Sequence, residues 1–290
     1  MFSPELVECK AFEILYKACP PEGTSLLKTL LLCFAWLLLM FALLLAGPAY
    51  MLASGEIRLD RAWHATERGP AGLAPDPATT TEAVVQVYAA RAFNWRGLFA
   101  VHTWIAVKQQ DAPAYTRYEV TRWRPASIPA RRDAPDRAWF GNPPKLLAEL
   151  RGETASAAIL AIEQALPDYP FRESYQAWPG PNSNTFTAWL VRRIPELRVE
   201  FPPTAIGKDY LHPGVLAGAT SGSGFQIALG GLLGLTIARD EGLEVNILGL
   251  VVGVDPLRPA VKIPGVGRLG TGTIPMAGDR DFNSAESALD

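Results

Sequence analysis

The chain has 290 residues, a formal net charge of −2, 49% hydrophobic residues and 19% charged residues. That length allows one or two domains with a buried core, and the charge balance offers no basic surface for nucleic acid or anionic lipid. The 25 glycines and 25 prolines favour a loop-rich, strand-containing domain over a helical bundle.

Cysteine and histidine usage excludes several kinds of site. The three cysteines, Cys9, Cys19 and Cys33, all lie at or before an N-terminal apolar run. The main domain therefore has no cysteine nucleophile, disulfide framework or zinc–thiolate site. With three histidines in the whole chain, we expect no multi-histidine metal site and no cofactor.

A candidate membrane span lies near the N-terminus. No charged residue occurs from 29 to 55, and the run exceeds the roughly 20 apolar residues that a helix needs to cross a bilayer. A cleaved signal peptide is the alternative, but 28 residues precede the run, whereas a signal peptide has a short charged region before its apolar core. We expect an uncleaved anchor, with a cytoplasmic segment at 1–28 and a transmembrane helix at 29–53.

The positive-inside count does not orient this span. Three lysines precede it and three arginines follow it at comparable distance: Lys10, Lys17, Lys28, Arg58, Arg61 and Arg68. We place the N-terminus in the cytoplasm because a single early span with a large C-terminal domain commonly exports that domain. This predicts a membrane protein whose C-terminal domain is exported.

The remaining chain divides by composition. Residues 54–82 include a stretch rich in Pro, Gly, Ala and Thr that is typical of a linker. A folded periplasmic domain is expected over 83–272. The polar tail, 273–290, is expected to be disordered.

The first half of this domain favours strands. Residues 82–93 open with a candidate strand, and 97–110 alternate clearly, with His102, Trp104 and Ala106 on one face. A second strand over 114–124 follows a connection short enough for a hairpin.

Helices are expected next. Residues 143–152 read as a short helix with Pro at its start and Gly at its end. Residues 153–166 predict a second helix that ends before Pro167, with a stripe through Ala157, Leu160, Ala161, Gln164 and Ala165 on one face. A third helix begins near Ser183, with Phe186, Trp189 and Leu190 at core-facing spacing.

Two apolar runs, 224–238 and 242–255, dominate the last third. Each is shorter than a membrane span, so a hairpin buried on both faces is favoured over membrane-inserted helices. A further alternative is that the apolar hairpin over 225–254 docks on the membrane or on a partner. The fold class expected for the domain is α+β, an antiparallel sheet with flanking helices.

Two residues are candidates for catalysis. His102, on a strand with apolar neighbours, is either a general base or acid or a half-buried histidine that packs with Trp104. Ser183 opens a helix, where Asn182, Ser183 and Asn184 are each suitable caps. The same helix start would present free N–H groups to an oxyanion and to a nucleophile, but a serine there needs a paired base.

Supporting residues are less well defined. Four carboxylates are candidates for orienting a histidine, and Glu119 is nearest across the expected hairpin: Glu119, Asp168, Glu173 and Asp209. The charged stretches 130–137 and 239–242 are expected to be solvated turns. Loops rich in aromatic residues and glycine add second-tier binding candidates: Trp139, Asn142, Lys208, Asp209 and Tyr210.

Five blocks in order carry a resemblance to a bacterial family, the domain of unknown function 3750. They are VHTWIAVK (101–108), WFGNPPKLLAELRGE (139–153), WPGPNSNTFTAWLVRR (178–193), FPPTAIGKDYL (201–211) and SGSGFQIALGGLLGL (221–235). The resemblance spans about residues 85–270. It implies a family but no activity. Together with the N-terminal span, it implies a bacterial inner-membrane protein with its C-terminal domain in the periplasm.

A strand histidine followed much later by the helix start Asn182-Ser183-Asn184-Thr185-Phe186 also resembles circularly permuted papain-like proteins, such as NlpC-type and lecithin retinol acyltransferase-like enzymes, in which the helix start is Asn-Cys-x-x-Phe. That resemblance implies His102 as the base and Ser183 in place of the usual cysteine. Because a serine–histidine pair must be activated during attack, it implies either a serine variant or a fold kept for binding.

Two functions follow. The first is a membrane-anchored envelope hydrolase or acyltransferase for amide or ester bonds, with His102 and Ser183 catalytic and Asn182, Asn184 and Thr185 at the substrate. The second is a non-catalytic envelope module that binds a peptide, glycan or protein partner, with Trp139 and Trp178 in contact with the ligand. An envelope peptide, glycan or lipid is the expected class of substrate for the first function. The sequence does not define the substrate, a third catalytic residue or the oligomeric state.

Overall fold

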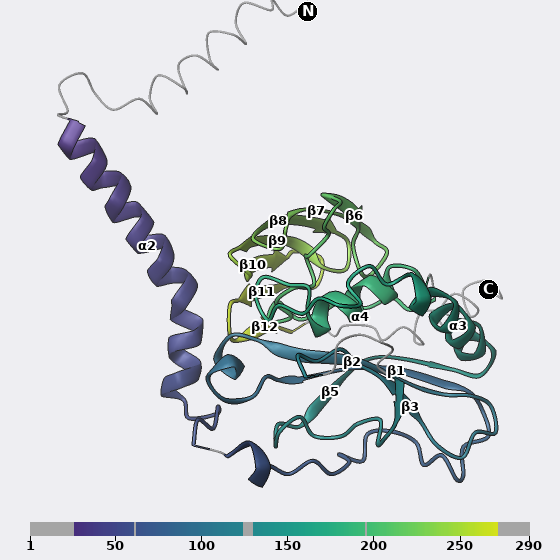
Figure 1. Cartoon of the computed structure of the whole chain (residues 1–290). Coiled ribbons are helices and arrows are strands. Elements are labelled where there is room, and N and C mark those ends of the chain that lie inside the picture. Colours follow the sequence, from purple (N-terminus) through teal and green to yellow (C-terminus); the bar gives the residue numbers. More distant parts are fainter. Residues whose placement is uncertain (1–25, 61, 124–129, 195, 272–290) are drawn as a thin grey trace, which may run out of the picture. The chain divides into compact units, whose positions relative to one another are not determined.

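A computed structural model describes residues 26–60, 62–123, 130–194 and 196–271. Three α-helices and two antiparallel sheets, one of five strands and one of seven, are found in this part of the chain (Figure 1). The expected α+β class with an N-terminal apolar helix is confirmed. Most of the predicted cytoplasmic segment and all of the predicted tail, 273–290, lie outside the described residues.

Helix α2 (Leu26–Ala53) contains the predicted transmembrane segment. It is long and apolar enough to cross a membrane. The end of the helix packs within the folded domain: a Cβ at Gly47 would collide with the carbonyl of Pro264, and Met51 is buried in a small cluster with Leu98. The close approach at Gly47 therefore requires glycine.

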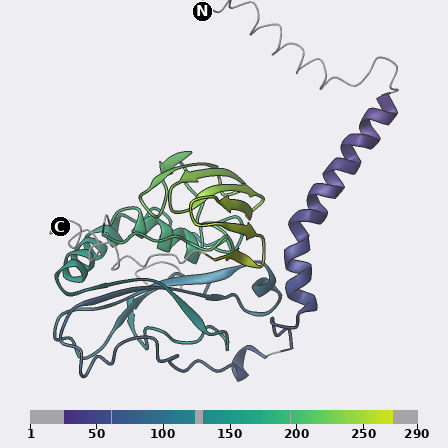
Figure 2. The same cartoon turned by 180° about the vertical axis from the view of Figure 1, so that it is seen from behind.

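The five-stranded sheet has the order β4-β3-β2-β1-β5, with every pair antiparallel. Its strands are β1 (Val84–Arg91), β2 (Val101–Lys108), β3 (Thr116–Tyr118), β4 (Ala130–Arg132) and β5 (Pro144–Arg151). Helices α3 (Gly152–Ala165) and α4 (Ser183–Val191) cover one face (Figures 1 and 2). Short 3-10 turns are η1 (Trp63–Ala65), η2 (Asn94–Leu98) and η3 (Leu166–Asp168). The predicted hairpin of β2 and β3 is confirmed.

Residues 143–152 were predicted as a helix, and this prediction is wrong because 144–151 form strand β5. Their Lys, Leu, Ala and Glu residues favour a helix locally. Pairing along the whole of β1 and burial of Ala148 and Leu150 outweigh that preference. The edge of β1 thus decides the conformation of this segment.

Helix α3 is confirmed, but its buried stripe is not the predicted one. The buried residues are Ala155, Ala158, Ile159 and Ile162, whereas Leu160 is 58% exposed. The two isoleucines bring more apolar area to the sheet than the alanines of the predicted stripe, so they decide which face turns inward.

The two faces of the five-stranded sheet pack against different layers. On the helix face, Ile105 of β2 joins the main core with Phe186 of α4. The opposite face carries Trp104, whose Nε1 donates to the carbonyl of Pro135 at 2.7 Å. Part of the predicted linker also packs on this face, where Ala74 contacts the cluster around Trp104.

The seven-stranded sheet follows in the order β12-β11-β10-β9-β8-β7-β6. Its strands are β6 (Leu216–Gly218), β7 (Gly224–Leu229), β8 (Leu233–Ala238), β9 (Gly242–Ile247), β10 (Leu250–Asp255), β11 (Ala260–Ile263) and β12 (Gly267–Gly270). The two apolar runs predicted as one doubly buried hairpin form four of these strands, so that prediction is wrong. Gly230–Gly231 and Leu248–Gly249 adopt positive φ and turn the chain in the middle of each run.

The inner face of the seven-stranded sheet carries buried charge. The register places Gln226, Thr236, Glu244, Lys262 and Arg268 in one row across the strands. Glu244 accepts from Lys208 Nζ and Lys262 Nζ, each at 2.6 Å. Lys262 Nζ also lies 2.8 Å from Glu200. These four groups form a chain of alternating charge, and Lys208 at one end also pairs with Asp209.

Candidate functional site

Strands β2, β3 and β4 present polar and aromatic side chains on the sheet face away from the helices. Arg117 pairs with Ala106 of β2 and with Arg131 of β4, and directly paired residues share a face. Because side chains of an extended chain point alternately to the two faces, every second residue after Arg117 lies on the same face. The row consists of Arg117, Glu119, Thr121 and Trp123, all of which line one cavity.

His102 and Glu119 form a buried pair in the inner part of the site. His102 Nε2 lies 3.1 Å from Glu119 Oε2, and both side chains are about 5% exposed or less. Burial alone would raise the pKa of Glu119, but the hydrogen bond with His102 and the charge of Arg117 lower it to about 2. Since an ionised carboxylate only accepts hydrogen bonds, His102 carries its proton on Nε2.

Burial lowers the pKa of His102 below its ordinary value, although the hydrogen bond with Glu119 opposes this shift and the charge of Arg117 adds to it. The folded state therefore binds a proton less readily than the unfolded state. The contribution of His102 to stability is complete above the pKa of the unfolded state, near 6.5, and is lost as the pH falls below that value.

We expect this pH dependence to disappear in His102→Gln, whose amide donates to Glu119 without titrating. Between pH 7.5 and 5, the wild type should lose stability relative to the variant, with a slope of at most about 1.4 kcal/mol per pH unit for one proton. Urea unfolding at several pH values measures the difference. The slope should persist in His64→Gln, where His102 is intact; an unchanged slope in His102→Gln would contradict the assignment.

Arg117 is a charged side chain held between a carboxylate and two indole rings. Its Nη2 donates to Glu119 at 2.6 Å, and its guanidinium lies 4.4 Å from the Trp104 ring centre and 5.9 Å from that of Trp139. Burial lowers the pKa of Arg117, but an arginine stays protonated in a protein. Among the described residues, its buried Nε has no hydrogen-bond partner.

Aromatic rings form one wall of the site. Trp139 stacks on His102 with centroids 3.6 Å apart, and Trp123 lies parallel to Trp139 at 6.2 Å. Phe140 meets both indoles edge-on. A bridge between Trp139 and Asn142 holds this turn, and Asn142 donates to the carbonyl of Arg91 at 3.0 Å.

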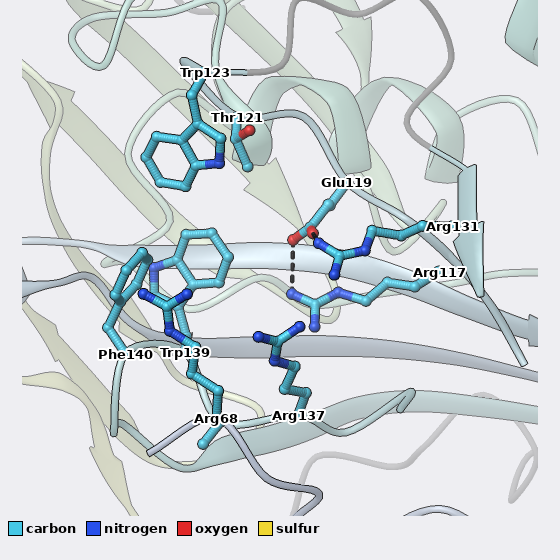
Figure 3. Close-up of a pocket in the computed structure, with 10 residues that line it drawn as sticks. Arg68, Arg117, Glu119, Thr121, Trp123, Arg131, Arg137, Trp139 and Phe140 are labelled. Atoms are coloured by element: carbon cyan, nitrogen blue, oxygen red, sulfur yellow. Dashed lines mark hydrogen bonds and ion pairs between the residues drawn. The ribbon is translucent and has the colours of Figure 1, made fainter. Parts of the chain in front are cut away.

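Three more arginines surround the cavity. Arg131 Nη2 and Arg137 Nη1 share Asp133, at 2.8 and 2.6 Å, and Arg131 Nη1 also lies 3.8 Å from Glu119. Arg68 lies 4.4 Å above the Phe140 ring and forms no ion pair with a described residue. Figure 3 shows Arg68, Arg117 and Arg137 directing their guanidinium groups toward the same space.

These residues line an open cavity of about 70 Å³. Four arginines face two carboxylates there, since Glu119 lines the cavity and Asp133 bridges its rim, so positive charge is in excess. The buried Oγ1 of Thr121, like Arg117 Nε, has no partner within the described part of the chain. No group of His, Cys, Asp or Glu in the described ranges is arranged to hold a metal ion. The arrangement suits a small anion.

The match to known proteins is confined to a family model. Residues 82–210 match the model described as protein of unknown function DUF3750. This segment belongs to that family. No curated protein and no solved structure matches the chain. The expected family is thus confirmed, over a shorter range than the five sequence blocks implied.

The DUF3750 segment contains the five-stranded sheet, both of its helices and most of the cavity. His102, Arg117, Glu119 and Trp139 lie inside it, whereas Arg68 precedes it and the strands of the seven-stranded sheet follow it. The histidine–carboxylate pair and the arginine row are therefore located in the family's own segment.

The structure does not bring Ser183 to His102. Thr103, the next residue on β2, donates its hydroxyl to Asn184 Oδ1 at 3.0 Å and to the carbonyl of Ser183 at 3.4 Å. Successive strand residues point to opposite faces. Ser183 therefore lies on the helix face, while His102 stacks on Trp139 on the other face. The hypothesis of a Ser183–His102 pair is not supported by this geometry.

Asn182, rather than Ser183, caps α4. Its Oδ1 accepts from the backbone N–H groups of Asn184 and Thr185, at 2.9 and 3.2 Å, and Thr185 Oγ1 accepts from Asn182 N at 3.1 Å. These are the N–H groups that an oxyanion would have needed. The reciprocal bonds form a capping box, which explains the polar residues here by helix termination.

The two predicted ligand-binding tryptophans have different places. Trp139 lines the arginine cavity. Trp178 is half exposed and donates its Nε1 to the carbonyl of Leu248 at 2.8 Å, at the turn between β9 and β10. Only Trp139 belongs to the candidate site.

The arginines around the cavity were not among the residues expected from the sequence. Residues 130–137 were expected to be a solvated turn, but Arg131 and Arg137 border the cavity and Asp136 is buried, where it accepts from the backbone N–H of Leu73. The pattern Arg117-x-Glu119-x-Thr121-x-Trp123 was the available signal, because its period of two places all four side chains on one strand face. Of the four carboxylates that were candidates for orienting a histidine, Glu119 is the one that contacts His102.

Proposed function

We propose that this chain is a membrane-anchored binding protein whose cavity receives an anionic group of its ligand. The observation that carries the proposal is a cavity bordered by four guanidinium groups, two of whose lining residues, Arg117 and Thr121, each hold a buried polar atom with no hydrogen-bond partner among the described residues. A buried polar atom without a partner costs free energy. A bound carboxylate or phosphate would satisfy such atoms and offset the excess positive charge.

The size of the cavity limits what enters it. About 70 Å³ accommodates one small charged group, so the remainder of the ligand would lie outside. Trp123, 64% exposed beside the cavity, offers a flat apolar surface to a sugar or aromatic ring. An anionic glycan or a peptide carboxylate of the cell envelope has this combination of charge and ring.

Binding is proposed in preference to hydrolysis or acyl transfer. Ser183 lies on the opposite face of the sheet, and Glu119 is already held by His102 and Arg117. Helix α2 serves as an uncleaved anchor, with the domain on the periplasmic side. The packing of Gly47 and Met51 within the folded domain supports retention of the helix. Protease digestion of intact spheroplasts tests the orientation, since a periplasmic domain would be cut.

Neighbouring arginines of β4 provide a matched test of the cavity. Arg131 pairs with Arg117 and faces the cavity. The next residue, Arg132, pairs with Thr116 instead and is exposed. We expect Arg131→Gln to weaken binding of inorganic phosphate or acetate about tenfold, because a hydrogen bond to a charged group contributes about 1.5–3 kcal/mol. Arg132→Gln should bind as the wild type does.

Isothermal titration of the full-length protein in nanodiscs measures these affinities. Ser183→Ala should also bind as the wild type, since the residue lies on the other side of the sheet. Equal affinities in Arg131→Gln and Arg132→Gln, or no anion binding by the wild type, would refute the proposal.

A further inference from the structure

The seven-stranded sheet has an outer face made entirely of apolar residues and glycine. Cross-strand pairing runs Phe225–Ile237–Leu243–Val254–Val261–Leu269 in one row and Leu216–Ile227–Leu235–Val245–Val252 in the next. Twelve large side chains of this outer face are 40–66% exposed: Leu216, Phe225, Ile227, Leu229, Leu233, Ile237, Leu243, Val245, Val252, Val254, Val261 and Leu269.

This sheet reverses the usual polarity of an antiparallel sheet. In a soluble domain the polar face is solvated and the apolar face packs on the core. Here Glu244 and Lys262 are buried on the inner face, at 2% and 1% exposure, while their strand neighbours Val245 and Val261 are 40% and 46% exposed. A contiguous apolar surface across a whole sheet exceeds the scattered apolar residues of ordinary surfaces and marks a contact face.

The end of α2 meets this same sheet. The turn between β11 and β12 contacts the helix, since a Cβ at Gly47 would collide with Pro264 and a Cβ at Gly265 would collide with Pro48. Val266, just before β12, packs against the cluster that contains Met51. The apolar face is thus attached, through the β11–β12 turn, to the point where the proposed anchor joins the domain.

We propose that the outer face rests on the lipid bilayer that α2 enters. The inference depends on α2 being the anchor and is independent of the anion cavity. The contact is superficial. Within the described residues, β6 and β12 form open edges of the sheet, and open edges do not occur within the hydrocarbon region. The apolar side chains reach the boundary between head groups and acyl chains, as those of an interfacial helix do, and the charged inner face stays in the protein.

A fluorescent probe on the face tests this contact in the full-length chain. In a background with Cys9, Cys19 and Cys33 replaced by serine, Val245→Cys carries an environment-sensitive nitrobenzoxadiazole label. The matched control is Leu160→Cys on α3, which is also an exposed apolar position, 58% against 40% for Val245. Each protein is reconstituted at one copy per phosphatidylcholine nanodisc, with and without nitroxide-labelled lipid.

We expect nitroxide lipid to reduce the emission at position 245 at least about twofold and to leave position 160 nearly unchanged. Adding Ile237→Glu, a charge in the adjacent row, should abolish the quenching at 245 while the protein remains in the disc. Equal, weak quenching at both positions would overturn the proposal. Blue-shifted emission at 245 without lipid quenching would also overturn it, because the face would then be covered by protein.

Discussion

Replacing Glu244 with glutamine is expected to lower the free energy of unfolding by about 3–5 kcal/mol, the usual cost of removing one partner from a buried ion pair. Glu244 is 2% exposed and accepts from Lys208 and Lys262 at 2.6 Å each. Burial would raise its pKa, but the two ammonium groups lower it. A glutamine of the same shape has one acceptor oxygen and directs its NH2 group at the second ammonium.

The two lysines explain the size of this effect. Burial alone would lower the pKa of Lys208, but the nearby carboxylates Asp209 and Glu244 raise it. Without the charge of Glu244, Lys208 retains Asp209 at 3.3 Å, and Lys262 retains Glu200 at 2.8 Å. Both ammonium groups then remain buried with half of their neutralising charge removed.

Urea unfolding of the full-length protein in nanodiscs measures this cost. The control is Glu173→Gln, because Glu173 is exposed and forms no ion pair with a described residue; its stability should change by less than about 0.5 kcal/mol. If the free energy of unfolding of Glu244→Gln changed as little as that of the control, the buried network would contribute little to stability.

Replacing Arg117 with methionine is expected to weaken anion binding about 100-fold, or close to 3 kcal/mol. Arg117 supplies both a full charge and the unpartnered Nε of the cavity. The variant also leaves Glu119 with His102 and the more distant Arg131, so it should unfold at lower urea concentration. This effect on stability alone does not distinguish a binding residue from a structural one.

Thr121→Val separates the two roles. In the absence of ligand, the buried hydroxyl of Thr121 has no partner among the described residues. The valine variant should therefore be as stable as the wild type or more stable by about 1 kcal/mol. Its affinity for phosphate should nevertheless fall about tenfold, because the hydroxyl no longer donates to the anion. Unchanged affinity in this variant would assign the hydroxyl no part in binding.

Much of the local structure follows from the sequence. The alternation of 101–108 predicted β2, and the uncharged run predicted α2. The polar residues before Phe186 predicted a helix start, and Asn182 provides the cap. Each of these features depends on residues close together in the chain, whose periodicity or side-chain chemistry is sufficient.

Features that depend on distant partners were not predictable in the same way. Residues 144–151 have helix-favouring composition but pair with the edge of β1. Apolar runs 224–238 and 242–255 were expected to be buried, whereas one face of each strand is exposed. Alternation was present in these runs, but an apolar outer face and a charged inner face invert the rule by which alternation is usually interpreted.

The sequence by itself determined the anchor-like helix, the α+β class and the absence of cysteine chemistry in the domain. Only the tertiary structure decided on which face of the sheet α4 packs. Strand β2 has apolar residues on both faces, since Trp104 and Ile105 are both buried, so its pattern is compatible with a helix on either side. The side chosen by α4 places Ser183 next to Thr103 and leaves His102 with the arginines.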